Sequence, residues 1–328
     1  MTVSADTLQI GIVEEATPGV TPATPAFDLV RLTGESINFT YNSTTSSELS
    51  GESRGVRDSI LTGGEAGGSI NIELSKNAAF EKMLAALMGS SFGNDPLGET
   101  ISADQVYVSS TKQSFTLEKR WDMGGGSPAY RYHRYLGLVP DTLTLNITPN
   151  EPITGSVGFI GNTLETGTTA IAGATYVSAG ANPVMTAPLV TGITLFDALD
   201  NNVFDVGTSC FTSIAVNLAS NNRAVNCIGT LGAKDTVLGR FEATIGYSVY
   251  FANDFMLDAL LAQTEYKLVV SVMDAAGNGY TLTFPRVKIS SAQVAAGGSG
   301  EDVVVTGEMT ALVPETPAYP MLVERIAA

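Results

Sequence analysis

The sequence predicts a mainly β protein made of two tandem β-sandwich lobes, each with one short flanking α-helix. Residues 67–89 alternate polar and apolar side chains and then change to a helical spacing. Residues 239–263 repeat this order. The composition is rich in Gly, Ser, Thr, Asn and Val and poor in charged residues, which is typical of a turn-rich β protein.

The two stretches define the helices and the repeat. Ser75 or Asn77 can cap the first helix, and Gly89 can end it in a left-handed conformation. Asn253 or Asp254 can cap the second helix. An overlay aligns similar residues of the two stretches, and we interpret it as an internal duplication. It pairs Ile72 with Ile245, Ser75 with Ser248, Met83 with Met256, Leu84 with Leu257 and Leu87 with Leu260.

Charge and cysteine content exclude several classes of protein. The net charge is −16, whereas a protein that grips nucleic acid through its phosphates needs the opposite sign. Cys210 and Cys227 are the only cysteines, too few for a disulfide framework, so reduced thiols made in a cytoplasm are expected. An intermolecular bridge through Cys227 stays open. We expect no secretion signal at the start, no transmembrane helix and no membrane association.

The chain divides into five expected segments. The proline-rich start, residues 1–34, is expected to be an extended arm, since its run of prolines suits neither a helix nor a central strand. Residues 35–161 form the first lobe and residues 208–312 the second. Residues 162–207, rich in Thr, Ala and Gly, are expected to link the lobes. Residues 313–328 are expected to be a second extended arm.

Within each lobe, a long polar loop precedes the repeated strand. Residues 42–66 and 219–238 occupy this place, and the sequence predicts no regular structure in them. Their matched positions favour contact with another molecule over disorder. The charged candidates for that contact are Arg54, Arg57 and Asp58 in the first loop and Arg223, Lys234 and Asp235 in the second.

Hairpins and further strands follow the helices. The first lobe is expected to have strands at 114–121 and 130–138, and the second at 266–273 and 280–285, with glycine-rich turns between them. Alternating residues predict more strands at 35–41, 141–148, 153–161, 286–293 and 301–312. Residues 90–112 are an insertion that the second lobe lacks.

The sequence indicates no enzyme and no cofactor or metal site. His133 is the only histidine and lies among Tyr and Arg residues at 130–135. No nucleophile motif accompanies it, so a surface or interface role is favoured over a catalytic base. Tyr and Arg are enriched at protein interfaces, which favours a protein contact over nucleic acid for this strand. Neighbouring carboxylates such as Glu301 and Asp302 point to opposite faces of a strand and cannot share one site.

The opening residues 11–27, GIVEEATPGVTPATPAF, resemble the start of tail tube proteins of long-tailed bacteriophages. The resemblance continues through Glu35–Ser36–Ile37, the loop with Arg54 and Arg57, and residues 67–74, GGSINIEL. It implies two tail-tube-type lobes whose inner sheets join those of neighbours into a barrel. Single-lobe members form hexameric rings, so it implies three copies of this chain in a pseudo-hexameric ring. The size favours a non-contractile tail.

The resemblance also implies partners and surfaces. The partners are other copies in the same and adjacent rings, and tape-measure, terminator and distal tail proteins of the virion. DNA passes through without specific binding, and the charged loop residues named above contact the adjacent ring. Outward residues of the repeat strands are small, polar or acidic, and we expect them to line the bore. They are Ser69, Asn71, Glu73, Thr142, Thr144, Asn146, Thr154, Ser156, Glu242, Thr244, Ser248, Thr306 and Glu308.

The alternatives belong to other classes. A virion- or cell-surface β-sandwich adhesin that binds carbohydrate or a receptor shares the composition, but it needs neither a helix in each lobe nor two matched loops. A monomeric hydrolase lacks a catalytic constellation. Rings or tubes in electron micrographs would favour a tail tube protein, and discrete monomers would favour the adhesin or the hydrolase.

Overall fold

The computed structural model describes residues 3–48, 55–93, 102–124, 129–205 and 210–327. The chain is mainly β, as predicted, with two α-helices in its described part. The first half forms β1 (Gln9–Glu14), β2 (Ala26–Leu29), β3 (Gly34–Glu35), β4 (Asn38–Thr45), β5 (Ser59–Glu73), α1 (Ala78–Leu87), β6 (Gln105–Tyr107), β7 (Phe115–Asp122), β8 (Tyr130–Ile147), β9 (Thr154–Gly161) and β10 (Thr163–Gly167).

The second half of the chain also consists mainly of strands with one α-helix, and each half contains one short 3₁₀ turn. It forms β11 (Thr175–Val177), β12 (Val190–Phe196), β13 (Asn202–Asp205), β14 (Phe211–Ala219), β15 (Arg223–Val225), β16 (Asp235–Val237), β17 (Glu242–Tyr250), α2 (Phe255–Ala262), β18 (Glu265–Met273), β19 (Gly279–Ala296), β20 (Val303–Ala311) and β21 (Leu322–Ile326). The 3₁₀ turns are η1 (Ala5–Thr7) and η2 (Ala187–Leu189).

The order of paired strands occurs twice. In the first strand set, neighbours run β2–β1–β7–β8–β9–β5–β4. In the second strand set they run β13–β12–β18–β19–β20–β17–β14. Each set places its helix between equivalent strands, α1 after β5 and α2 after β17.

Bulges align the two sets residue by residue. The β8–β9 register shifts between Pro140 and Thr142, and the β19–β20 register shifts between Ile289 and Ser291. With these shifts superposed, Thr142 corresponds to Ser291. Carried through the strand partners, Ile72 corresponds to Val249 and not to Ile245, so the overlay made from the sequence is four residues out of register in this strand. It is out by the same four residues in the helix, where Leu84 corresponds to Leu261 and not to Leu257. The helix caps Asn77 and Asp254 continue the corrected alignment.

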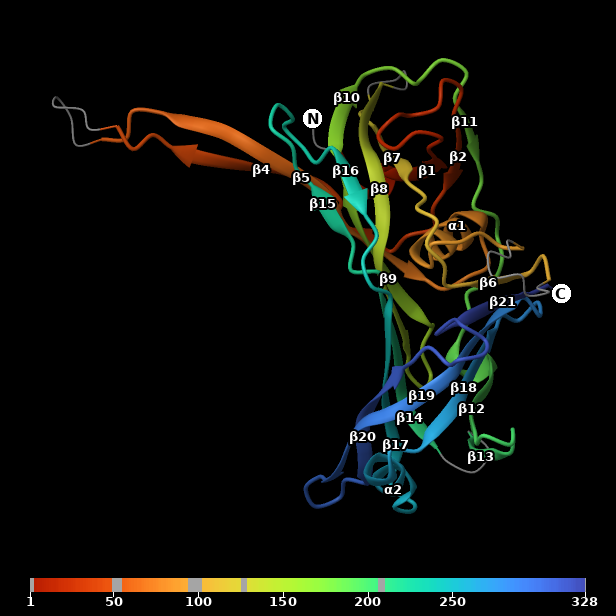
Figure 1. Cartoon of the computed structure of the whole chain (residues 1–328). Helices are drawn as coiled ribbons and strands as arrows, with labels where there is room; N and C mark the ends of the chain where they lie inside the picture. Colours follow the sequence, from red (N-terminus) through yellow and green to blue (C-terminus); the bar gives the residue numbers. More distant parts are fainter. Residues whose placement is uncertain (1–2, 49–54, 94–101, 125–128, 206–209, 328) are drawn as a thin grey trace.

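A single junction joins the two sets into one sheet. The second half of β8 pairs with β14, from Thr142 opposite Ala219 to Ile147 opposite Ile214. One continuous sheet therefore runs β4–β5–β9–β8–β14–β17–β20–β19. Figure 1 shows this sheet descending through the molecule, with the β4–β5 hairpin projecting away from its upper part.

Several segments differ from the sequence prediction. The expected arms and linker contain strands: β1 lies between β2 and β7, β12 pairs with β18, and β21 pairs with both β19 and β6. These strands are short, so each one gives little periodic signal between prolines and polar residues. The strands predicted at 130–138 and 141–148 are one strand, β8, and β19 is likewise continuous.

The long polar loop predicted at residues 42–66 is instead largely a β-hairpin. β4 and β5 pair from Asn38 opposite Gly67 to Thr45 opposite Ser59. Beyond Phe39 the side chains of β4 are exposed on both faces, so the hairpin has no apolar alternation that a sequence pattern could report. Residues 49–54, which come between β4 and β5 in the chain, lie outside the described residues.

Helix α1 lies where the two sets meet. Asn77 caps it by accepting a hydrogen bond from the backbone N–H of Phe80, as predicted, and Gly89 follows it with φ +63°. Phe80 and Leu84 share an apolar cluster with Tyr280 of β19 and with Val323 of β21, the strand that pairs with β19. The rings of Phe80 and Tyr280 meet edge to face at 5.6 Å.

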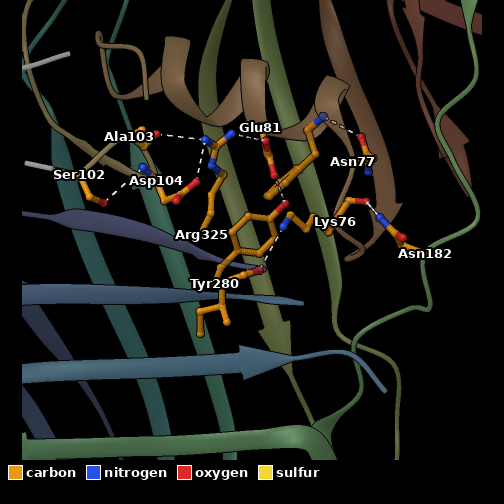
Figure 2. A network of polar contacts seen from close by, with 11 residues as sticks. Lys76, Asn77, Glu81, Ser102, Ala103, Asp104, Asn182, Tyr280 and Arg325 are labelled. Carbon is orange, nitrogen blue, oxygen red and sulfur yellow. Dashed lines mark hydrogen bonds and ion pairs between the residues drawn. The ribbon is translucent and has the colours of Figure 1, made fainter. Parts of the chain in front are cut away.

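A polar network closes over this cluster (Figure 2). Arg325 of β21 donates to Glu81 of α1 at 2.9 Å and to Asp104 at 3.0 Å. The hydroxyl of Tyr280 donates to the same glutamate at 3.3 Å, and the Lys76 ammonium donates to the Ile326 carbonyl. The helix of the first set is thus held by β19 of the second set and by β21, which pairs with β19.

Candidate functional site

The continuous sheet has one apolar face and one polar face, and the polar sheet face is the candidate site. In β14, the buried residues Ile214, Val216 and Leu218 alternate with Ser213, Ala215 and Asn217. The same alternation holds in β17. Strand pairing keeps side chains of one parity on one face, so the polar residues form continuous cross-strand rows.

All the residues predicted to line a bore lie on the polar sheet face. One row contains Asn71, Ser156, Thr144, Asn217, Thr244 and Thr310. A second contains Glu73, Thr154, Asn146, Ala215, Gly246 and Glu308. A third contains Ser69, Gly158, Thr142, Ala219 and Glu242, and a fourth contains Ser213, Ser248, Thr306 and Gln293.

The sequence reasoning missed the part of this face that β14 contributes. Asn217 stands in the middle of the first row, between Thr144 and Thr244. The signal was present, since residues 211–219 alternate in the same way as the repeat strands. Lys288, opposite Thr310, is a basic residue on this face, but its ammonium lies 3.3 Å from a carboxylate oxygen of Glu265.

The sheet ends in two open edges. In the described part of the chain, β4 pairs only with β5, and residues 291–296 of β19 pair only with β20. An unpaired edge presents free N–H and C=O groups and invites pairing with another strand. The sheet is therefore incomplete at both ends.

Side chains cover the backbone groups of the β4 edge. Ser36 donates its backbone N–H to Ser69 of β5, so the alternate residues Ile37 and Phe39 turn theirs outward. The Ile37 N–H donates to Glu35 Oε2 at 2.8 Å, and the Phe39 N–H donates to Asn38 Oδ1 at 2.9 Å. The Lys119 ammonium donates to the Ile37 carbonyl.

Lys119 makes this cover partly ionic. Its ammonium lies 2.5 Å from Glu35, and both side chains are largely buried. Burial lowers the pKa of Lys119 from its ordinary value, while the hydrogen bond to Glu35 opposes that change.

The two charged loops adopt different structures. Arg57 and Asp58 are exposed just before β5, on the projecting hairpin, and Arg54 lies outside the described residues. Arg223, Lys234 and Asp235 belong to the short β15–β16 hairpin. Asp235 forms an ion pair with Lys112 at 2.5 Å, which lowers the pKa of this carboxyl, so it already has a partner inside the chain.

Other polar clusters have structural roles. Glu15 is buried and accepts hydrogen bonds from Ser114, Thr116 and the backbone of Gly137. His133 is half-buried and its ring meets Trp121 edge to face at 4.8 Å. Cys210 and Cys227 are exposed free thiols. Within the described residues, no group of three or more His, Cys, Asp or Glu side chains could hold a metal ion.

Comparison with known proteins gives one match. The family model described as phage tail tube protein matches residues 6–311, which is nearly the whole chain. No curated protein matches the sequence. In the parts of the chain that the structure describes, neither helix has the length and apolar character of a membrane span.

Proposed function

Because the chain belongs to the phage tail tube protein family and is therefore a structural component of the virion tail, we propose that its copies close into rings that stack to form the tail tube. The observation that carries this proposal is the continuous sheet with two open edges. Joining these edges between copies would satisfy their backbone groups and close the sheets into a barrel.

The proposed ring contains three copies. The repeated strand order supports two tube lobes in one chain, corresponding to the first and second strand sets. The family resemblance implies six lobes around a ring, which three such chains supply. The ring is then pseudo-hexameric, and the tail is proposed to be long and non-contractile.

The polar sheet face is proposed to line the bore. Its rows are made of small, mostly polar residues and the acidic residues Glu73, Glu242 and Glu308. The charge of Lys288 on this face is balanced by Glu265, 3.3 Å away. Each basic contact to a phosphate adds affinity for DNA, so a neutral and acidic surface lets a polyanion slide during genome ejection without binding it.

The β4–β5 hairpin is proposed to reach the adjacent ring. It projects from the body (Figure 1) and carries exposed apolar side chains at Tyr41, Ile60 and Leu61. Exposed apolar residues on a projecting element favour contact with another molecule. Arg57 and Asp58 are proposed to contact the next ring from this hairpin. Arg223, Lys234 and Asp235 are proposed to do so from the β15–β16 hairpin.

Electron microscopy of the purified protein tests the assembly. We expect rings or tubes, with threefold symmetry and sixfold pseudo-symmetry in averaged images. Discrete monomers that bind glycans would instead support a virion-surface adhesin. Contacts with tape-measure, terminator and distal tail proteins belong to the same proposal.

A set of lysine substitutions tests the bore. We expect Asn71→Lys, Thr144→Lys and Thr244→Lys together to leave tubes intact and to slow DNA ejection, because the bore would then attract phosphate. The matched control places three lysines at Thr24, Thr175 and Ser178, which are exposed at or beside β2 and β11, two strands that are not part of the continuous sheet. Equal ejection rates for the two variants would contradict the assignment of the bore.

A further inference from the structure

We infer that neighbouring copies join by repeating the junction that already exists inside the chain. Residues 35–40 of one copy pair antiparallel with residues 291–296 of the next, in the register of the internal β14–β8 pairing. The occupant of each open edge is thus the other open edge of a second copy. This inference rests on the proposed function and deepens it by assigning the interface to named residues.

The register follows from two correspondences. On one side of the junction, Thr144 lies two residues beyond the β8 bulge and Gln293 lies two residues beyond the β19 bulge. On the other side, Asn217 pairs with Thr244, whose partner is Thr310. Asn38 pairs with Gly67, whose partner is Ile160. Ile160 pairs with Val139, and Thr310 pairs with Lys288. Val139 and Lys288 are equivalent, because each comes one residue before the last paired residue that precedes the bulge of its strand.

Asn38 therefore occupies the place of Asn217, and Gln293 occupies the place of Thr144. Because Asn217 pairs with Thr144 inside the chain, Asn38 of one copy is expected to pair with Gln293 of the next. Asn38 and Gln293 are both exposed. The pair would extend a row of the polar sheet face across the boundary between copies.

The apolar residues beside the β19 edge support the same arrangement. Leu74 and Leu145 are 1% and 5% exposed, and they share a cluster with Tyr280 and Leu282 of β19 and Val323 of β21. Their counterparts at the open end are Phe251 and Val294, which are 40% and 44% exposed. These two positions keep apolar side chains although nothing in the described chain buries them fully, so a second copy is expected to cover them.

The alignment also names what would cover them. In the first strand set, Arg131 and His133 of β8 occupy the places that Tyr280 and Leu282 occupy in β19. Trp121 lies opposite Arg131 and packs against His133. This aromatic and arginine surface of the next copy is expected to meet Phe251 and Val294, and such residues are enriched at interfaces.

The side chains over the β4 edge are consistent with an edge that is covered in the single chain and pairs with a strand of another copy on assembly. Glu35, Asn38 and Lys119 bond to the outward groups of Ile37 and Phe39 in the single chain. Covering an edge with charged side chains keeps it from pairing indiscriminately. These side chains must move aside when residues 291–296 of the next copy arrive.

Cysteine cross-linking tests the register in the full-length protein. The native thiols are first removed by Cys210→Ser and Cys227→Ser, and Asn38→Cys and Gln293→Cys are added. Directly opposite residues in this type of antiparallel pair bring their Cα atoms to about 4.5 Å, within reach of a disulfide. We expect mild oxidation of assembled protein to give covalent dimers and trimers on non-reducing gels.

Two control variants give the expected limits: one should cross-link within a single chain, and the other should not cross-link efficiently. Asn217→Cys with Thr144→Cys joins the internal template pair, so it should form a disulfide within one chain and no covalent multimers. Asn38→Cys with Val294→Cys is one residue out of register, which turns one thiol to the opposite face and should prevent efficient cross-linking.

The outcomes separate this inference from the proposed function. Rings or tubes whose subunits cross-link through positions 38 and 293 support both. Rings or tubes that cross-link no better than the 38/294 control overturn the register and leave the proposed function standing. Protein that stays monomeric in micrographs and on gels overturns both.

Discussion

Helices α1 and α2 occupy equivalent places in the two strand sets, yet only one is enclosed. The alignment through the helix caps places Leu84 of α1 at the position of Leu261 of α2. Leu84 is 4% exposed and Leu261 is 82% exposed. The residue type is the same, so the difference comes from the surroundings and not from the helix itself.

The surroundings of α1 include elements from the other half of the chain. Tyr280, Leu282 and Val323 pack near Leu84, and Arg325 bonds to Glu81. For α2 there is no further strand set in the same chain to play this part. The contrast teaches that α1 marks a completed junction between sets and that α2 marks the place where we expect a second copy.

The largest expected effect contrasts the two leucines directly. Leu84→Ala should lower the free energy of unfolding by about 2–5 kcal/mol, because it removes buried methyl groups and leaves a cavity. Leu261→Ala should change it by less than about 0.5 kcal/mol, since that side chain is exposed in the single chain. Urea unfolding of monomeric protein, followed by circular dichroism, measures both. Similar losses for the two variants would mean that α2 is covered within the chain.

The next effect concerns the polar network that encloses α1 (Figure 2). Arg325→Met should cost about 1–2 kcal/mol, because it leaves Glu81 without its charged partner in a site that is only partly exposed. Arg240→Met is the matched control: its side chain is 84% exposed and lies 3.7 Å from Glu242, so the expected cost is near zero. A negligible cost for Arg325→Met would show that packing alone holds β21 against α1.

Local patterns predicted the elements on which this comparison depends. The change of period after Leu74 gave α1, and Asn77 and Gly89 gave its ends. Alternation placed the polar residues of β5, β9, β17 and β20 on outward positions, which the strand rows bring together. Each of these features is encoded within a few residues of where it appears.

Long-range pairing was beyond such patterns. The junction between residues 142–147 and 214–219 depends on which distant strand supplies the partner, and no local signal states this. The β4–β5 hairpin was predicted as a loop because its outer part is exposed on both faces. The overlay of the two repeats failed in β17 because alternating strands match equally well when shifted by an even number of residues.

A third prediction moves from folding to assembly. Leu261→Asp should leave the unfolding of the monomer almost unchanged and should raise the protein concentration at which rings form, because a charge would be buried at the interface. Asp258→Asn, on an exposed position of the same helix, controls for a general effect of altered charge. Light scattering across a concentration series measures the onset. An unchanged onset for Leu261→Asp would place α2 outside the contact between copies.

The smallest effect concerns His133, whose counterpart Leu282 helps to enclose α1. Burial lowers the pKa of His133 from its ordinary value, and the nearby Lys119 charge lowers it further. The unfolded chain therefore takes up the proton first as the pH falls. Stability is complete above the ordinary histidine pKa of about 6.5 and declines as the pH drops below it. Because His133 is the only histidine, the difference in unfolding free energy between the protein and His133→Gln isolates this term between pH 5 and pH 7.5.

In the proposed ring the same imidazole lies against Phe251 and Val294 of a neighbour, where a charge is costly. Ring formation should then weaken over the same pH range in the protein and not in His133→Gln, and parallel behaviour of the two would remove His133 from the interface.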